Sequence, residues 1–216
     1  MDNGIQSIYF QDLLKRYPEL KSCAGEIIQA YEALEASFSA GCKLLVAGNG
    51  GSAADAQHIT GELMKSFLKK RPLSPKFEKA MEDVDAELGK ELGGCLQQAL
   101  PTIALDSHTA LSTAIMNDGN PHMVFAQQVN GYGRKGDVLI AISTSGRSRN
   151  ILYAAVVAKA KGMTVIGLTG DKESRLSQIA DICIKVPETE WYKVQEGHLP
   201  IYHALCLMLE EKFFNE

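Results

Sequence analysis

Short runs of apolar residues alternate with longer amphipathic stretches along most of the 216-residue chain. The short runs are bounded by Gly, Pro or Asp, as expected of buried strands, and they lie at 44–47, 101–105, 137–142, 164–168 and 182–186. Between them, apolar residues recur every three or four positions, which indicates helices. Strands that alternate with helices predict a parallel sheet covered on both faces, and therefore an α/β fold.

Two helical segments add to this alternating core. Residues 1–41 predict two helices broken at Pro18, and such a pair has too little core of its own. We expect it to pack on the main domain or on a neighbouring subunit. Residues 70–100 form an inserted, charged and amphipathic segment, which predicts either a surface helix or a cover over a cleft. The length otherwise fits one domain spanning 1–216.

Composition narrows the class of protein. The net charge is −4 and Lys and Arg form no cluster, which argues against nucleic acid as a partner. No apolar run approaches the length of a membrane span, and the N-terminus lacks the pattern of a signal peptide, so we expect no membrane association. The five cysteines are scattered without C-x-x-C spacing, which is typical of reduced thiols in a cytoplasmic protein.

The first candidate site follows the first strand, where Gly48-Asn49-Gly50-Gly51-Ser52 leads into a helix. Glycine allows a sharp turn and a close approach of the backbone to a ligand. Ser52, with Asp55 three residues later, predicts a helix cap, and free amides at a helix start bind anions. The loop has neither a dinucleotide nor a P-loop fingerprint, so we expect no nucleotide cofactor. Taken alone, it fits a tight connection equally well.

A second candidate loop follows the strand at 137–142. Four hydroxyl residues surround Gly146 there, namely Ser143, Thr144, Ser145 and Ser148. Hydroxyls and helix-start amides together make a neutral cradle for a phosphate, although surplus serines at a helix cap would give the same pattern. Because ligands bind at the carboxyl ends of parallel strands, we expect both loops at one edge of the sheet.

The last helix carries three polar candidates. We expect it to begin near Gln195, with Pro200 in its first turn, because proline is tolerated there. Gln195 and His203 then lie within a quadrant of each other, whereas His198 points away from His203.

Titratable residues on two helices suggest two kinds of chemistry. His58 and Glu62 are four positions apart and share one face of a helix. A carboxylate and an imidazole that face one phosphosugar can move a proton between adjacent carbons through an enediol. Together with Gln195 and His203, the same residues offer the nitrogen and oxygen ligands that zinc accepts. The residues alone leave both interpretations open.

Four motifs in order resemble the sugar isomerase (SIS) family, and within it the phosphoheptose isomerases: Gly48-Asn-Gly-Gly-Ser-x-x-Asp-Ala-x-His-x-x-x-Glu62, Asn117-Asp118, Ser143-Thr-Ser-Gly-x-Ser148 and Gln195-x-x-His-x-x-x-x-His203. The resemblance implies a flavodoxin-like, three-layer sandwich with a five-stranded parallel sheet. It also implies a homotetramer with active sites between subunits. The implied reaction converts sedoheptulose 7-phosphate to D-glycero-D-manno-heptose 7-phosphate, for lipopolysaccharide or other surface glycans.

The resemblance also implies roles for residues. Glu62 and His203 would be the catalytic acid/base pair. The phosphate would be held by Ser143, Thr144, Ser145 and Ser148. The sugar would contact Asn49, Gly50, Gly51, Ser52, Asn117, Asp118 and Gln195. Some members bind zinc through residues that match His58, Glu62, Gln195 and His203.

Two alternatives stay open from the sequence: an isomerase of another phosphosugar, or a non-catalytic SIS module that senses phosphosugars or binds proteins. The chain keeps both Glu62 and His203, which favours catalysis. It departs from the family pattern at Gly61, where many members have a second acid, and at Arg147, where Asn is commoner. Arg147 could add a phosphate contact, and the length of the 70–100 segment could change the sugar pocket.

Overall fold

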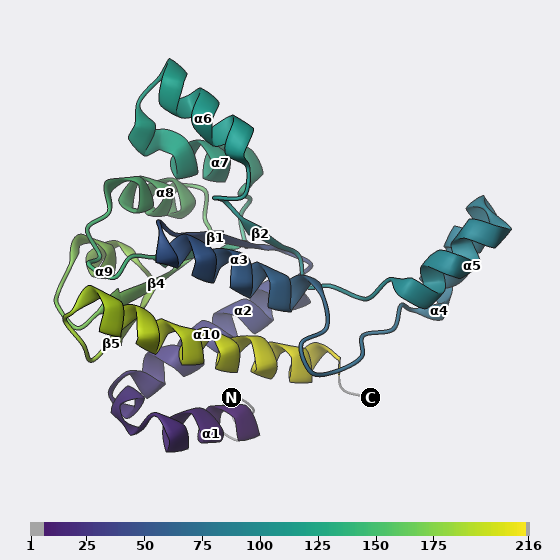
Figure 1. The fold of residues 1–216 in the computed structure, drawn as a ribbon, viewed down its shortest axis with the longest axis horizontal. Coiled ribbons are helices and arrows are strands. Elements are labelled where there is room, and N and C mark those ends of the chain that lie inside the picture. The colour runs from purple at the N-terminus through teal and green to yellow at the C-terminus, as the bar shows by residue number, and fades with distance from the viewer. Residues whose placement is uncertain (1–6, 215–216) are drawn as a thin grey trace.

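The computed structural model describes residues 7–214, and its centre is a five-stranded sheet (Figure 1). The strands lie in the order β2-β1-β3-β4-β5, and every neighbouring pair is parallel. Their bounds are β1 (Leu44–Ala47), β2 (Thr102–Ala104), β3 (Val138–Ile142), β4 (Thr164–Gly170) and β5 (Ile182–Val186). The predicted parallel α/β sheet is confirmed.

Helices fill most of the remaining chain. Before β1 come α1 (Ile8–Arg16), the 3₁₀ turn η1 (Pro18–Cys23) and α2 (Ala24–Ser39). Between β1 and β3 lie α3 (Gly51–Met64), α4 (Pro75–Val84), α5 (Ala86–Cys95), α6 (Thr109–Asp118), η2 (Pro121–Met123) and α7 (Val124–Tyr132). The remaining helices are α8 (Arg149–Ala160), α9 (Arg175–Ile179) and α10 (Trp191–Phe213). None of the helices within residues 7–214 has the length and apolar character that a membrane crossing needs.

Successive strand residues face opposite helical layers. In β1, Leu44 and Val46 belong to a core shared with α1, α2, α3 and α10, whereas Leu45 and Ala47 belong to a core shared with α7, α8 and α9. All four side chains are fully buried, so both faces of the sheet are covered. This is the predicted three-layer sandwich.

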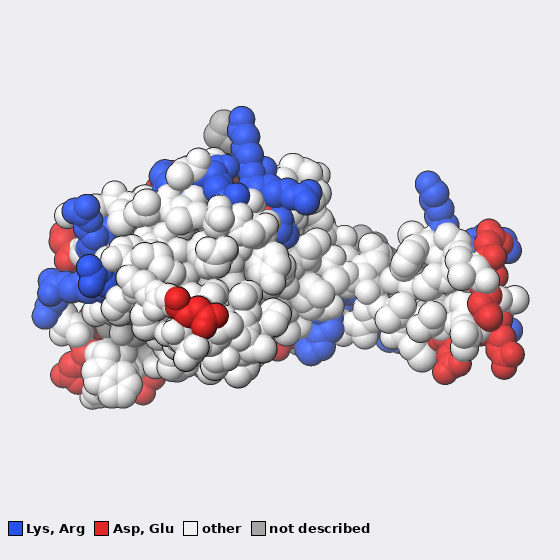
Figure 2. Space-filling view, turned by 90° about the horizontal axis from the view of Figure 1, so that it is seen from above, with Lys and Arg blue, Asp and Glu red and all other residues white. Residues whose placement is uncertain are grey.

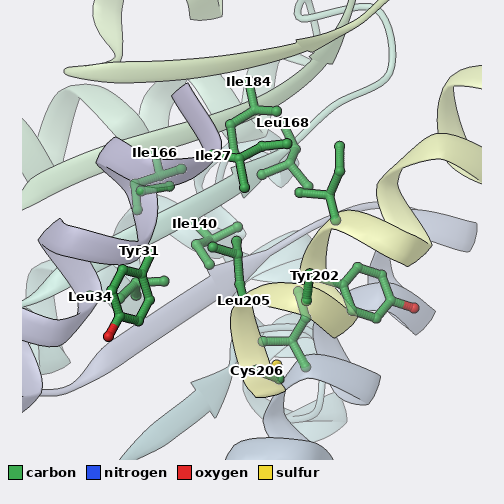
Figure 3. Packing of buried hydrophobic residues seen from close by; sticks show 14 of the residues in the cluster. Ile27, Tyr31, Leu34, Ile140, Ile166, Leu168, Ile184, Tyr202, Leu205 and Cys206 are labelled. Atoms are coloured by element: carbon green, nitrogen blue, oxygen red, sulfur yellow. The ribbon is translucent and has the colours of Figure 1, made fainter. Parts of the chain in front are cut away.

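The N- and C-terminal helices share the larger core with the sheet. Figure 3 shows Ile27 of α2 and Leu205 of α10 packed with the strand residues Ile140 and Ile166. Burying a side chain of this size stabilises the fold by about 1.5–3 kcal/mol. From Ser7 onward, the N-terminal segment therefore packs on the sheet of its own chain.

The strand order places a crevice between β1 and β3. The chain passes from β1 to β2 on one side and later returns to add β3 on the other side. Ligands bind outside the carboxyl ends of the strands at such a reversal, and the order 2-1-3-4-5 has it between its first and third strands. The glycine loop follows β1 and the serine loop follows β3, so both lie at this crevice.

The 70–100 segment forms a helical hairpin that projects from the body of the molecule (Figure 1). The prediction of a single surface helix is wrong, because the segment forms two helices. Asp85 has an extended backbone and ends α4, and its side chain caps α5 by accepting from the amides of Glu87 and Leu88. A Cβ on Gly89 would lie 2.4 Å from the Glu82 amide nitrogen, so glycine allows the two helices to cross closely. Acidic side chains gather at the outer end of the hairpin (Figure 2). The hairpin extends away from the crevice of its own chain and does not cover it.

Candidate active site

The loop after β1 turns on two glycines. Gly50 has φ of +56°, a region that favours glycine, and a Cβ on Gly48 would lie 2.1 Å from the Ser52 carbonyl oxygen. α3 begins at Gly51 with Gly50 as its N-cap, and no side chain of the described residues caps it. The predicted cap by Ser52 and Asp55 is wrong, because the helix already includes Ser52 and the Asp55 carboxylate faces α10 instead.

The loop after β3 is tightly bonded within itself. The Ser143 hydroxyl donates to Ser148 Oγ at 3.1 Å, and Ser145 Oγ accepts from the Arg147 amide at 3.3 Å. Gly146 has φ of +61°, which a side chain rarely adopts. Ser148 is the N-cap of α8, but its side chain makes no capping bond to the described residues of the helix. The helix start therefore keeps amides that an anion can accept as partners.

Two asparagines join the loops across the crevice. Asn49 Nδ2 donates to Asn150 Oδ1 at 3.0 Å, and Asn150 Nδ2 donates to Asn49 Oδ1 at 2.8 Å. This reciprocal pair sets the spacing between the glycine loop and the start of α8. Asn150 was missed by sequence reasoning, and its one signal was its place directly after the serine loop.

A cavity of about 230 Å³ opens beside the serine loop. Thr144 and Ser145 line it together with Arg147 and Lys172, and the carboxylates of Asp171 and Glu188 also line it. Two of the predicted phosphate ligands thus lie beside a space that also presents cationic side chains.

α3 and α10 lie side by side and bring three predicted residues together (Figure 1). His58 Nε2 is 3.3 Å from Glu62 Oε1 and 3.4 Å from His203 Nε2. The Glu62 side chain is 13% exposed and that of His58 is 42% exposed, so the group is open to a ligand on one side. Burial, followed by the charge of His58, lowers the pKa of His203. Its imidazole is therefore neutral near pH 7.

A chain of hydrogen bonds lies behind this group. The Tyr202 hydroxyl is 3.0 Å from His58 Nδ1 and donates to Asp55 Oδ1 at 3.3 Å, while Gln195 Nε2 donates to Asp55 Oδ2 at 3.4 Å. Burial raises the pKa of Asp55, and burial followed by the Asp55 charge raises the pKa of Tyr202. Tyr202 was missed by sequence reasoning, although its spacing of seven from Gln195 puts both on one helix face.

The four predicted zinc ligands are only partly brought together. Gln195 lies against the glycine loop, since a Cβ on Gly51 would be 2.0 Å from its Nε2. His58, Glu62 and His203 meet further along α3. Within residues 7–214, no group of three or more His, Cys, Asp or Glu side chains is arranged to hold a metal ion. The orientation of His58 does suit a ligand, because Nδ1 is bonded and Nε2 faces the other two side chains.

The course of α10 differs from the prediction near its start. The helix begins at Trp191, so Pro200 lies inside it rather than in its first turn. Pro200 is buried, and tertiary packing outweighs the hydrogen bond that proline forfeits. His198 points away from His203, as predicted. It is fully buried with Nε2 at 3.4 Å from the Thr169 carbonyl oxygen, and burial lowers the pKa of His198 to about 4.

Two predicted sugar ligands stand apart from both loops. Asn117 and Asp118 are exposed at the end of α6, where the Asn117 amide donates to the Asp118 carboxylate at 2.8 Å. The main neighbours of α6 are η2 and α7.

A buried ion pair that sequence reasoning missed supports the end of α3. Glu210 accepts the backbone amides of residues 67–69 at 2.7, 2.8 and 3.1 Å and pairs with Arg71 at 2.9 Å. Arg71 also donates to the carbonyls of Leu63 at 2.8 Å and Glu62 at 2.9 Å. Burial opposes ionisation, but these donors outweigh it and lower the pKa of Glu210. The pair thus caps the helix that carries Glu62.

The chain matches a family profile, relatives of similar sequence and solved structures. The SIS domain family profile matches residues 78–170. The phosphoheptose isomerase of Burkholderia pseudomallei (strain 1710b) is 41% identical over 185 residues, which is 86% of this chain and 81% of the relative. That of Rhodospirillum rubrum is 38% identical over 192 residues, covering 89% and 88%. The structure of phosphoheptose isomerase GmhA from Neisseria gonorrhoeae superposes with a TM-score of 0.73 at 30% identity, over 94% of this chain and 95% of that one.

Proposed function

The chain belongs to the phosphoheptose isomerase family of SIS-domain proteins, and we propose that it converts sedoheptulose 7-phosphate to D-glycero-D-manno-heptose 7-phosphate. It is thus an aldose–ketose isomerase, and its product would supply heptose for surface glycans. The observation that carries this proposal is the meeting of Glu62, His58 and His203 between α3 and α10, in a fold whose crevice is bordered by the glycine loop and the serine loop.

The phosphate end of the substrate would bind at the serine loop. Ser143, Thr144, Ser145 and Ser148 offer hydroxyls, and the start of α8 offers amides with the positive end of its helix dipole. Arg147 would add charge to a dianion from the neighbouring cavity wall. This end of the site fixes position without taking part in bond making.

The proton transfers would take place between α3 and α10. The Glu62 carboxylate removes a proton from C1 of the ketose and returns a proton to C2, while His203 exchanges protons with the two oxygens of the enediol. A neutral His203 suits this role, because it can donate from one nitrogen and accept at the other. Asn49 and Gln195 would hold the sugar hydroxyls beside the glycine loop.

We also propose that each active site combines two subunits of a homotetramer. Gly51 and Glu62 are eleven residues apart on α3, which is about 16 Å along the helix axis. The serine loop is joined to the Gly51 end of that helix through Asn49. Since a seven-carbon phosphosugar is shorter than this path, we propose that the serine loop of one subunit serves the acid/base pair of another. The exposed Asn117 and Asp118 would then serve a neighbouring subunit as well.

Subunit mixing tests this arrangement. Glu62→Gln and Ser145→Ala/Ser148→Ala chains, each inactive alone, would regain turnover when they are unfolded together and refolded as mixed oligomers. Mixed oligomers without activity would contradict shared sites. The control is each variant refolded alone.

Zinc is a further proposal, with His58, Glu62 and His203 as ligands. Gln195, which the family resemblance implies as a fourth ligand, lies against the glycine loop in the single chain. These nitrogen and oxygen atoms match the preference of zinc, and His58 Nε2 already faces Glu62 and His203. The ion would polarise the carbonyl of the sugar. Metal analysis of protein purified without chelator tests the proposal. A His58→Gln variant that retains as much zinc as the unchanged protein would refute it.

A cytoplasmic location is the remaining proposal. All five cysteines are unpaired, and burial raises the pKa of Cys23 to about 11, which keeps this thiol protonated and unreactive. Thiol titration of lysate protein, denatured without reductant, that gave fewer than five free cysteines would count against it.

A direct assay separates the proposed reaction from its alternatives. Purified protein would be given sedoheptulose 7-phosphate, arabinose 5-phosphate and glucosamine 6-phosphate in parallel. We expect turnover of the heptose phosphate. Saturable binding without turnover of any of the three would favour a sensor instead.

A further inference from the structure

We propose that the hairpin of α4 and α5 pairs with the same hairpin of a second copy of this chain, each tip entering the base of the other. The tip is the segment of residues 82–87, where α4 turns into α5. The base is the cavity between residues 69–72 and 93–97, where the hairpin leaves the body (Figure 1). The pairing is independent of the proposed reaction, because neither part holds a proposed active-site residue.

The hairpin has almost no core within its own chain. None of the residues of α4 is buried, and Gly89 is the one buried residue of α5. The two helices contact mainly each other. A helix of ten residues is marginal alone in water, so most of its stability has to come from the packing of an apolar face. We therefore expect a partner for this face.

One side of the hairpin carries its apolar side chains. Gly89 and Gly93 of α5 face α4, since Cβ atoms there would lie 2.4 Å from the Glu82 amide nitrogen and 3.5 Å from Glu78 Cγ. Each of these four facing residues directly follows an apolar residue, namely Phe77, Met81, Leu88 or Leu92. Because the two helices run antiparallel, the positions just before the facing residues lie on the same side of the hairpin. On that side, Phe77, Leu88 and Leu92 are 51%, 56% and 44% exposed.

The two ends of the hairpin carry opposite charge. Residues 82–87 read Glu-Asp-Val-Asp-Ala-Glu, and acidic side chains gather at this outer end (Figure 2). Residues 69–72 read Lys-Lys-Arg-Pro, and Lys70 is exposed beside the base cavity. Ion pairs within the chain already engage Arg71 and Asp83. Two hairpins packed in the same direction would bring like charges together, whereas antiparallel packing sets each acidic tip against a basic base.

The base has room for an apolar side chain between its charges. The cavity has a volume of about 700 Å³, and Leu96 and Phe214 line it together with the lysines. Val84 is 89% exposed at the tip, between Asp83 and Asp85. A valine flanked by carboxylates matches a cavity that has apolar walls and cationic edges, so charge and shape point to the same occupant.

The pairing is reciprocal, so one two-fold axis generates both tip-to-base contacts. The apolar faces of the two hairpins then meet between these contacts and form a four-helix bundle. A tetramer with perpendicular two-fold axes has more than one interface of this kind. Hairpin pairing is therefore compatible with active sites that are shared at another interface.

A disulfide trap in the whole chain tests the geometry. Cys95 is exposed and lines the base cavity, so Val84→Cys would place a thiol at the tip opposite a natural thiol of the partner. We expect mild oxidation to give a covalent dimer on non-reducing gels, joined through positions 84 and 95 in peptide mass spectrometry. The matched control, Val84→Cys/Cys95→Ser, should give no dimer joined in this way. A dimer of Val84→Cys joined through position 84 of both chains, or no covalent dimer, would overturn the proposal.

Exchanging charges tests the pairing without oxidation. Glu87→Lys and Lys70→Glu each bring like charges together, so sedimentation at a series of protein concentrations should show about tenfold weaker association. In Lys70→Glu/Glu87→Lys the charges have exchanged places, and association should recover. The control Glu19→Lys makes the same charge change on η1 and should leave association unaltered.

Three results of the sedimentation experiment would overturn the proposal. These are unaltered association in both single variants, no recovery in the double variant, and an unchanged protein that sediments as a monomer, which would assign the apolar face to a different partner. Association is measured without substrate. Failure of the proposed reaction would therefore be seen separately, as absence of turnover by the unchanged protein.

Discussion

Removing the carboxylate of Glu210 should destabilise the protein more than its position far from the reacting atoms suggests. Its side chain is 1% exposed, and that of Arg71 is fully buried. Glu210→Ala would leave the three backbone amides of residues 67–69 without their acceptor and the Arg71 charge without its partner.

The expected loss of stability follows from the cost of removing only one partner of a buried ion pair. Such changes cost about 3–5 kcal/mol, because an uncompensated charge remains in the interior. Replacing both partners by apolar residues, as in Arg71→Met/Glu210→Leu, should cost less than either single change. Turnover should fall as well, because Arg71 holds the last carbonyls of the helix that carries Glu62.

Urea unfolding of the two variants and the unchanged protein measures the free energies. Asp83→Ala on the hairpin is the control, since it breaks an exposed pair with Lys79 and should leave the midpoint unchanged. A loss below about 1 kcal/mol in Glu210→Ala would refute the reasoning, because that is the size of an ordinary hydrogen bond. The pKa of Glu210 is lowered in the folded state, so its contribution is present above the unfolded pKa of about 4.3 and disappears as the pH falls further.

The remaining predictions concern other parts of the fold. Gly48→Ala should destabilise the protein by about 2 kcal/mol in urea unfolding, because its Cβ would lie 2.1 Å from the Ser52 carbonyl oxygen, whereas Gly25→Ala, with open space, should not. Gly146→Ala should weaken phosphosugar binding in calorimetry, since φ is +61° and a Cβ would lie 2.1 Å from Ser174 Oγ; unchanged affinity would argue against the serine loop as the phosphate site. His198 has a pKa of about 4 when folded and about 6.5 when unfolded, so the unfolded state binds more protons between these values and stability falls by about 3 kcal/mol as the pH drops through them. In His198→Leu this fall in stability should be absent when urea unfolding is measured across the same pH range. A pH profile identical to that of the unchanged protein would refute the role of His198.

The fold was largely predictable because its strands are short apolar runs buried on both faces. β1 and β5 have the predicted bounds, since flanking glycine, aspartate and proline leave little choice. The helix starts were less predictable. Ser52 is typical of an N-cap and Pro200 of a first turn, yet Ser52 lies within α3 and Pro200 lies well inside α10. For Pro200, tertiary packing outweighs the local preference.

The site was predictable only in part. His58 and Glu62 are one turn apart on a single helix, so their proximity follows from spacing alone. The Tyr202 hydroxyl, by contrast, contacts His58 from 144 positions away, and Arg71 meets Glu210 across 139. Nothing in the local sequence distinguishes these residues from ordinary core or surface side chains, because their roles depend on which helices the fold sets side by side.

The most direct test of the central claim is an NMR experiment on sedoheptulose 7-phosphate in D₂O with the unchanged protein and with Glu62→Gln. An enediol route with proton exchange predicts an aldoheptose 7-phosphate that carries deuterium at C2. Glu62→Gln should form no product while it still binds the phosphosugar in calorimetry. No conversion by the unchanged protein would contradict the proposed reaction, and undiminished conversion by Glu62→Gln would contradict the assignment of Glu62 as the base.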